Sequence, residues 1–235
     1  MDDDLDKQDI VTGQRRRDLF EVCVFLSLIV PSMVFSFFGS GNGSPSFTIV
    51  ALSVIIRELA LTGLILFFLW RNGEPLASIG WTFDGLKKEA ALGVGLFIPV
   101  LICDSLVVEA FQKLGLSPHM SRLPQFLTAK GPPEVLLACL LVTIVAVTEE
   151  TIFRGYMMLR FNSLTANVAV SVLMSSAVFS LGHGYEGAAR IAAIGVLGII
   201  LASVYDWRKS LIAPVVIHFL VDFFLLVLMP LVRVR

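Results

Sequence analysis

The sequence is poor in cysteine and in charge, and each shortage excludes a class of protein. The three cysteines, Cys23, Cys103 and Cys139, all lie in apolar stretches and form no CxxC pair. This pattern excludes a disulfide framework and a zinc ribbon, and we interpret all three as small buried hydrophobic residues. Charged residues make up only 16% of the 235 residues, and the formal net charge is −1. We therefore expect no nucleic-acid partner.

Tyrosine and tryptophan are also scarce, at three each, whereas phenylalanine occurs 18 times. Apolar residues reach 56% and the mean hydropathy is +0.84, while a soluble domain has about 45–50% apolar and about 25% charged residues. The composition predicts an all-α fold, a polytopic helical bundle in the lipid bilayer. A cleaved signal peptide is not expected, because the apolar stretch after Arg15–Arg17 runs past Phe38 without a cleavage pattern.

About seven stretches are long enough to cross a bilayer, which takes about 20 residues. They are residues 19–38, 47–70, 89–111, 134–160, 162–183, 187–205 and 211–231. We expect one transmembrane domain over residues 19–232, after a polar N-terminal arm at residues 1–18. Lysine and arginine in the short loops favour a cytoplasmic N-terminus, and the compact chain favours a bacterial inner membrane.

Two adjacent carboxylates, Glu149 and Glu150, lie at the end of an apolar run. An acidic residue at the centre of a membrane helix costs roughly 2.5–3.5 kcal/mol even on lenient scales. Two such residues side by side therefore need partners or a function. Other apolar segments supply possible partners in His183, His218 and Asp222, whereas the third histidine of the chain, His119, is expected in a loop.

A spacing of four residues occurs three times among these groups, and on a helix it places both side chains on one face. The pairs are Glu150 and Arg154, Phe179 and His183, and His218 and Asp222. The first is expected to form an ion pair, which leaves Glu149 unpaired. Because neighbouring helical residues point about 100° apart, the two glutamates are predicted to have different roles.

These groups are suited to peptide hydrolysis. A carboxylate in a low-dielectric pocket can take a proton from water, and a neutral imidazole beside it can hold that water. A second imidazole, oriented or charged by Asp222, can stabilise the oxyanion that forms when water attacks an amide.

Other interpretations remain open. Glu149, His183 and His218 form an acceptable two-histidine, one-carboxylate site for a divalent metal, although the HExxH motif is absent. Haem ligation by two histidines would leave the paired glutamates unexplained. An ion-coupled transporter would use buried carboxylates, but the chain has no half-to-half symmetry. A non-catalytic membrane scaffold or immunity protein is the remaining alternative. Arg57 and Glu58, within the second span, are interpreted as a structural pair.

The motifs resemble those of the CPBP family, the CAAX proteases and bacteriocin-processing enzymes that are also called the abortive-infection family. Glu149–Arg154 is similar to its EExxxR motif, Phe179–His183 to FxxxH, and His218–Asp222 to its last motif, HxxxN/D. The resemblance covers about residues 133–225, with the motifs in the family's order.

The resemblance implies an intramembrane endopeptidase that acts on a peptide or a membrane-associated protein. It implies that Glu149 and His183 activate water, that His218 and Asp222 stabilise the oxyanion, and that Glu150, Arg154 and Phe179 support the site. No cofactor is needed if the enzyme is a glutamate protease, and zinc or another divalent metal is needed if it is a metalloprotease. Eukaryotic members have asparagine where Asp222 stands, and an ionised aspartate cannot donate to an oxyanion. This difference leaves the choice between the two types open.

The predicted helix boundaries contain one inconsistency. A fifth helix that begins at Asn162 would place His183 about 30 Å along it, at 1.5 Å per residue. Glu149 is only about halfway along the fourth helix. Either the fifth helix tilts and begins below the membrane surface, or the predicted boundaries are wrong.

Overall fold

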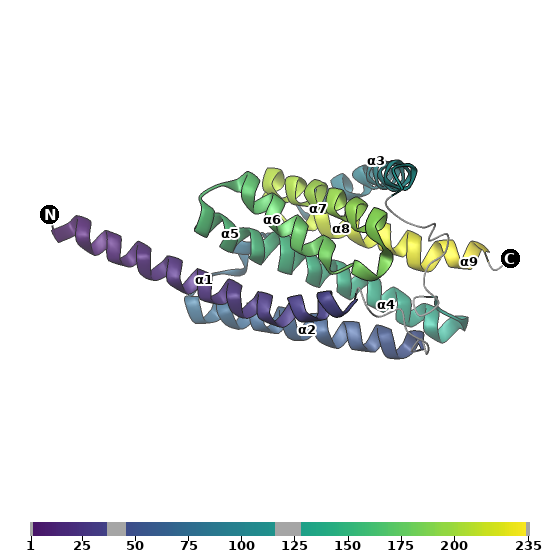
Figure 1. Ribbon diagram of the computed structural model, residues 1–235, viewed down its shortest axis with the longest axis horizontal. Helices are drawn as coiled ribbons and strands as arrows, with labels where there is room; N and C mark the ends of the chain where they lie inside the picture. Colours follow the sequence, from purple (N-terminus) through teal and green to yellow (C-terminus); the bar gives the residue numbers. More distant parts are fainter. Residues whose placement is uncertain (1, 37–45, 116–127, 234–235) are drawn as a thin grey trace.

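The protein folds as a bundle of helices, without strands in the part of the chain described (Figure 1). The structure is a computed structural model, and it describes residues 2–36, 46–115 and 128–233. His119 lies outside the described residues. Its longer helices are α1 (Asp2–Ser36), α2 (Phe47–Asn72), α3 (Leu86–Lys113), α4 (Gly131–Glu149), α6 (Val168–Leu181), α7 (Ala188–Arg208) and α8 (Ile212–Asp222). The shorter ones are η1 (Leu76–Ile79), η3 (Glu150–Met157), α5 (Met158–Thr165), η4 (Gly184–Glu186), η5 (Phe223–Leu228) and α9 (Met229–Arg233).

Five helical stretches are long and apolar enough to cross a membrane, and α6 is a shorter apolar helix. The five are Phe47–Asn72, Leu86–Lys113, Gly131–Thr165, Ala188–Arg208 and Ile212–Val232. Two of them are composite, because α4, η3 and α5 form one continuous stretch, and α8, η5 and α9 form another. The prediction of an all-α membrane bundle is confirmed, and the protein is an integral membrane protein.

The N-terminal arm is helical and continues into the first predicted span. Helix α1 runs without interruption from Asp2 to Ser36, and its N-terminal half extends beyond the rest of the bundle (Figure 1). The end of the arm is anchored, because the buried Asp18 accepts a hydrogen bond from Ser163 in α5.

The boundary predicted between the fourth and fifth spans is wrong. The fourth helical stretch continues to Thr165, Ala166 has a positive φ of 51°, and Asn167 caps α6 by accepting from the Val170 N–H. Glu149 is therefore about 24 Å from Thr165, at 1.5 Å per residue. His183 is about 22 Å beyond the start of α6 at Val168 on the same measure. The later start of the fifth helix removes the inconsistency, because the two residues now lie at similar depths.

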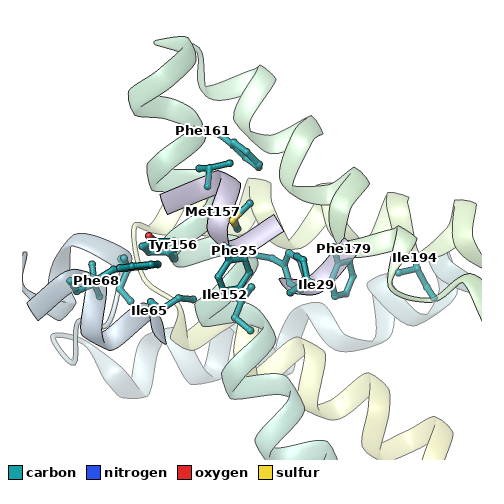
Figure 2. Packing of buried hydrophobic residues seen from close by; sticks show 14 residues of the cluster. Phe25, Ile29, Ile65, Phe68, Ile152, Tyr156, Met157, Phe161, Phe179 and Ile194 are labelled. Carbon is teal, nitrogen blue, oxygen red and sulfur yellow. The ribbon is translucent and has the colours of Figure 1, made fainter. Parts of the chain in front are cut away.

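The π-helical segment η3 lies in the middle of the main hydrophobic core. Ile152, Tyr156 and Met157 pack there with Phe25 of α1 and Phe179 of α6 (Figure 2). The opposite side of η3 lies against η1, where a Cβ on Gly155 would be 2.8 Å from a backbone carbonyl oxygen of Ile79. Large side chains on one side and a glycine on the other thus fix the position of the segment.

A buried carboxylate in α1 holds three parts of the bundle together. Glu21 accepts hydrogen bonds from Arg71 and Asn72 at the end of α2, at 2.6 and 2.8 Å, and from the Tyr156 hydroxyl and Arg160 Nε, at 2.6 and 2.9 Å. Glu21 has no solvent exposure. This polar cluster fixes α1 and α2 to the C-terminal end of the stretch that carries the two adjacent glutamates.

Candidate active site

The helix that carries the two glutamates changes its winding at Glu150. From Glu150 to Met157 it is π-helical, and all eight residues are buried. Such segments are rare and are frequent at functional sites. Ser175 of α6 donates a 2.6 Å hydrogen bond to the Phe153 carbonyl oxygen within this segment, so the neighbouring helix supports the altered winding.

Glu150 joins the helix's own arginine to a histidine from α8. Its Oε1 accepts from Arg154 Nη1 at 2.8 Å and lies 2.7 Å from His218 Nδ1. The side chains of Glu150 and Arg154 have no solvent exposure, and Arg154 Nη2 also donates to the Gly198 carbonyl oxygen at 3.4 Å. The predicted ion pair is confirmed. Because a carboxylate only accepts, the short contact assigns a hydrogen to Nδ1 of His218.

The other nitrogen of His218 faces two more carboxylates. Its Nε2 lies 3.8 Å from Glu149 Oε2 and 3.4 Å from Asp222 Oδ2. Glu149 Oε2 is buried and has no hydrogen-bond partner among the described residues. The two glutamates thus reach opposite nitrogens of one imidazole. Glu150 is the nearest carboxylate to His218, and Asp222, at the predicted four-residue spacing, contacts the other nitrogen of the ring.

His183 follows the C-terminus of α6, and its ring is held by Phe179. Its Nδ1 lies 3.2 Å from the Phe179 carbonyl oxygen. Because that oxygen only accepts, Nδ1 carries the hydrogen and Nε2 is left as an acceptor. The Phe179 ring packs edge-on against both histidines, at centroid distances of 5.2 and 5.9 Å, and the Arg154 guanidinium lies 4.2 Å from the same ring. Phe179 therefore packs against the buried cation and against both imidazoles.

These groups line a cavity of about 380 Å³. Its polar wall contains the four predicted catalytic residues, Glu149, His183, His218 and Asp222. Its apolar wall comes from α1, α2 and α4, and includes Ile29, Val54 and Val145 among others. The cavity thus joins a carboxylate and imidazole cluster to a hydrophobic groove in the same compartment.

Comparison with known families identifies the segment that carries these motifs. The model described as type II CAAX prenyl endopeptidase Rce1-like matches residues 131–224. This segment is similar to that family. The Rce1-like segment begins with α4 and ends within η5, so it includes every residue of the three motifs. The similarity supports a protease. No curated protein and no solved structure matched the chain.

The Rce1-like segment does not form the three-ligand metal site considered above. Within residues 2–36, 46–115 and 128–233, no three His, Cys, Asp or Glu side chains are arranged to hold one metal ion. Glu149 Oε2 lies 3.8 Å from His218 Nε2. The residues in this arrangement do not fit a metal, and we derive no step through one.

Other polar residues of the cavity were not predicted to belong to the site. Arg57 and Glu58 come from α2, outside the Rce1-like segment. Tyr185 and Glu186 lie in η4, just after His183, and Arg190 lies in the first turn of α7. The polarity of Tyr185 and Glu186 between two apolar stretches was the available signal. No pattern in the sequence indicated that α2 forms a wall of the same cavity.

Proposed function

We propose that this protein is a membrane-embedded endopeptidase that hydrolyses a peptide bond in a CAAX-type or other membrane-associated peptide. The observation that carries the proposal is the Glu149 carboxylate. Its Oε2 is buried without a hydrogen-bond partner among the described residues, 3.8 Å from His218 Nε2, in the cavity that His183 also lines. A buried acceptor without a partner is costly in a structural role and is suited to accepting a proton from water.

In this proposal Glu149 acts as the general base. The water donates one hydrogen to the Glu149 carboxylate, and the acceptor Nε2 of His183 holds the other hydrogen. The water oxygen then forms a bond to the carbonyl carbon of the substrate, and the proton passes to Glu149.

His218 stabilises the charge that develops on the substrate oxygen. With Nδ1 fixed by Glu150, the doubly protonated ring has a donor at Nε2, on the side that faces Glu149 and Asp222. A donor held in position before the reaction is effective because little reorganisation is needed. When the intermediate collapses, the carbon–nitrogen bond breaks and Glu149 returns its proton to the leaving amine.

The hydrophobic groove suggests the kind of substrate. An apolar wall formed by α1, α2 and α4 beside the polar cluster is suited to a peptide that carries a lipid or a membrane-inserted segment. A substrate anchored in the bilayer reaches such a cavity by lateral diffusion. We propose that the N-terminus is cytoplasmic and that the membrane is the bacterial inner membrane.

The test is cleavage of a peptide panel, including a farnesylated CAAX peptide, by the purified protein with and without a strong chelator. Wild-type protein is expected to cleave at least one peptide in chelator, and Glu149→Gln to lose that activity while keeping the thermal stability of the wild type. Activity that a chelator abolishes and one divalent ion restores would instead assign Glu149, His183 and His218 to a metal. Unchanged activity in Glu149→Gln would refute the proposal, and a protein that cleaves no peptide would favour a non-catalytic scaffold.

A further inference from the structure

The Arg57–Glu58 pair of α2 has a location that a purely structural ion pair does not need. Both residues line the cavity that contains Glu149, although α2 lies outside residues 131–224. Arg57 lies roughly 15 Å from the start of α2, which is roughly 39 Å long. At that position the residue is within the hydrocarbon layer. A charged side chain at that depth normally faces a partner or a water-filled cavity.

The contacts of this pair satisfy the glutamate but not the arginine. Arg57 donates from Nε and Nη2 to one oxygen, Glu58 Oε1, at 3.2 and 2.9 Å. The second oxygen, Glu58 Oε2, accepts from the Thr148 hydroxyl at 3.4 Å, and Glu58 is buried. Across the described parts of the chain, Arg57 Nη1 donates no hydrogen bond, and half of the Arg57 side chain is exposed. The guanidinium thus keeps its Nη1–Nη2 edge available, and such an edge matches the two oxygens of a carboxylate.

The cavity's second arginine is more fully neutralised and less exposed. Arg190 Nη1 donates to Asp104 at 2.5 Å, and its Nε donates to Glu186 at 3.1 Å. Two carboxylates thus neutralise this single cation, and its side chain is 23% exposed, against 50% for Arg57. Of the two arginines, Arg57 is therefore the one that an anionic ligand in the cavity can reach without competing with two carboxylates.

We propose that Arg57 binds the free α-carboxylate at the C-terminus of the substrate, with Glu58 holding the guanidinium in place. This inference rests on the proposed peptidase function and adds a determinant of specificity to it. Glu58 contacts Thr148, the residue directly before Glu149, so the carboxylate site lies beside the water-activating group. A chain whose last carboxylate is held there presents a bond close to its C-terminus for hydrolysis.

The experiment measures binding separately from cleavage. A farnesylated CAAX peptide with a free C-terminal carboxylate and the same peptide as its C-terminal amide are titrated against purified protein in detergent. A charge-assisted bidentate contact is expected to make wild type bind the free acid at least about tenfold more tightly than the amide. Arg57→Gln is expected to bind the two peptides equally, and Arg57→Lys to keep part of the preference.

Two further variants keep the result interpretable. Arg57→Gln leaves Glu58 buried without its cation, so the double variant Arg57→Gln/Glu58→Gln tests the same loss without an unpaired charge. Arg190→Gln is the matched control, because it removes the other guanidinium of the cavity and is expected to leave the acid-to-amide ratio unchanged.

The outcomes separate this inference from the proposed function. Three results would overturn the inference. Wild type could bind the acid and the amide equally, or it could bind neither peptide. The preference for the acid could also survive in both Arg57 variants that carry glutamine. If wild type cleaves both peptides equally well, the peptidase function stands and the role of Arg57 does not. If wild type binds the acid selectively through Arg57 but cleaves nothing, the carboxylate site stands and the peptidase function fails.

Discussion

Replacing Arg154 by methionine would leave the Glu150 carboxylate buried without its cation. Neither side chain has any solvent exposure, and Nη1 and Oε1 are 2.8 Å apart. Removing one partner of such a pair costs about 3–5 kcal/mol, because the remaining Glu150 charge is not solvated and keeps only the Nδ1–H of His218 as a partner. One kcal/mol shifts the Tm of a 150–250-residue protein by about 2–4 °C, so Arg154→Met is expected to lower Tm by about 6–20 °C.

The double variant Glu150→Gln/Arg154→Met is expected to recover more than half of that loss. It removes both charges, and the amide oxygen of the glutamine can still accept from Nδ1 of His218. Two residues in direct contact typically show an interaction energy of about 0.5–3 kcal/mol. The loss in the double variant is thus expected to be smaller than the sum of the two single losses.

A control with the same spacing exists on α3. Lys113 and Glu109 also form an ion pair four residues apart, but their side chains are 74% and 59% exposed. Lys113→Met and Glu109→Gln are expected to shift Tm only slightly, because solvent already screens the pair. The assay is thermal unfolding of the purified proteins in one detergent. The reasoning is refuted if Arg154→Met costs no more than Lys113→Met, or if the Glu150 and Arg154 losses are additive.

Four other substitutions test the site and its support. Gly155→Ala is expected to cost roughly 1–3 kcal/mol through overpacking, measured as a lower Tm than that of Gly95→Ala, because no atom lies within 4 Å of the Cβ position of Gly95. Glu21→Gln is expected to lower Tm, since the buried cluster that it joins loses its central anion; an unchanged Tm would show that α1 is held otherwise. Phe179→Leu is expected to lower kcat more than Tm, because the ring that packs against both site histidines is lost. Asp222→Asn is expected to retain activity, with a loss far smaller than the roughly 10²–10³-fold that removal of an oxyanion donor costs; a loss of that size would assign an essential charge to Asp222.

Hydropathy and short-range spacing were sufficient to predict the membrane bundle and the pairing of Glu150 with Arg154. Both depend on features that lie close together in the sequence, an apolar run or a four-residue interval. Within the described residues, the cavity also brings Glu149 and His183 together, although these residues are 34 positions apart and no spacing rule relates them. Their neighbourhood was expected from the resemblance to a family.

The end of the fourth helix could not be located from apolar pattern alone. The chain turns at Ala166 with a positive φ, where the sequence has neither glycine nor proline and an alanine must adopt the left-handed conformation. The next residue, Asn167, is a favourable N-cap and does cap α6. That signal was present in the sequence, but the apolar run around it suggested continuity.

The orientation of His218 shows that helical spacing identified one contact of this ring but not the shorter one. A four-residue interval places Asp222 on the face of α8 that carries His218, and Asp222 does approach Nε2, at 3.4 Å. The shorter contact, 2.7 Å from Nδ1, comes from Glu150, 68 residues earlier in the chain. Both glutamates have α-helical dihedral angles, φ −66° and ψ −38° for Glu149 and φ −66° and ψ −36° for Glu150, so the predicted separation of about 100° holds. Glu149 and Glu150 therefore approach opposite nitrogens of one ring. Asp222 shares the Nε2 side with Glu149, so Glu150 and Asp222 restrain the imidazole from two sides. An asparagine at this position could make the same contact through its amide oxygen.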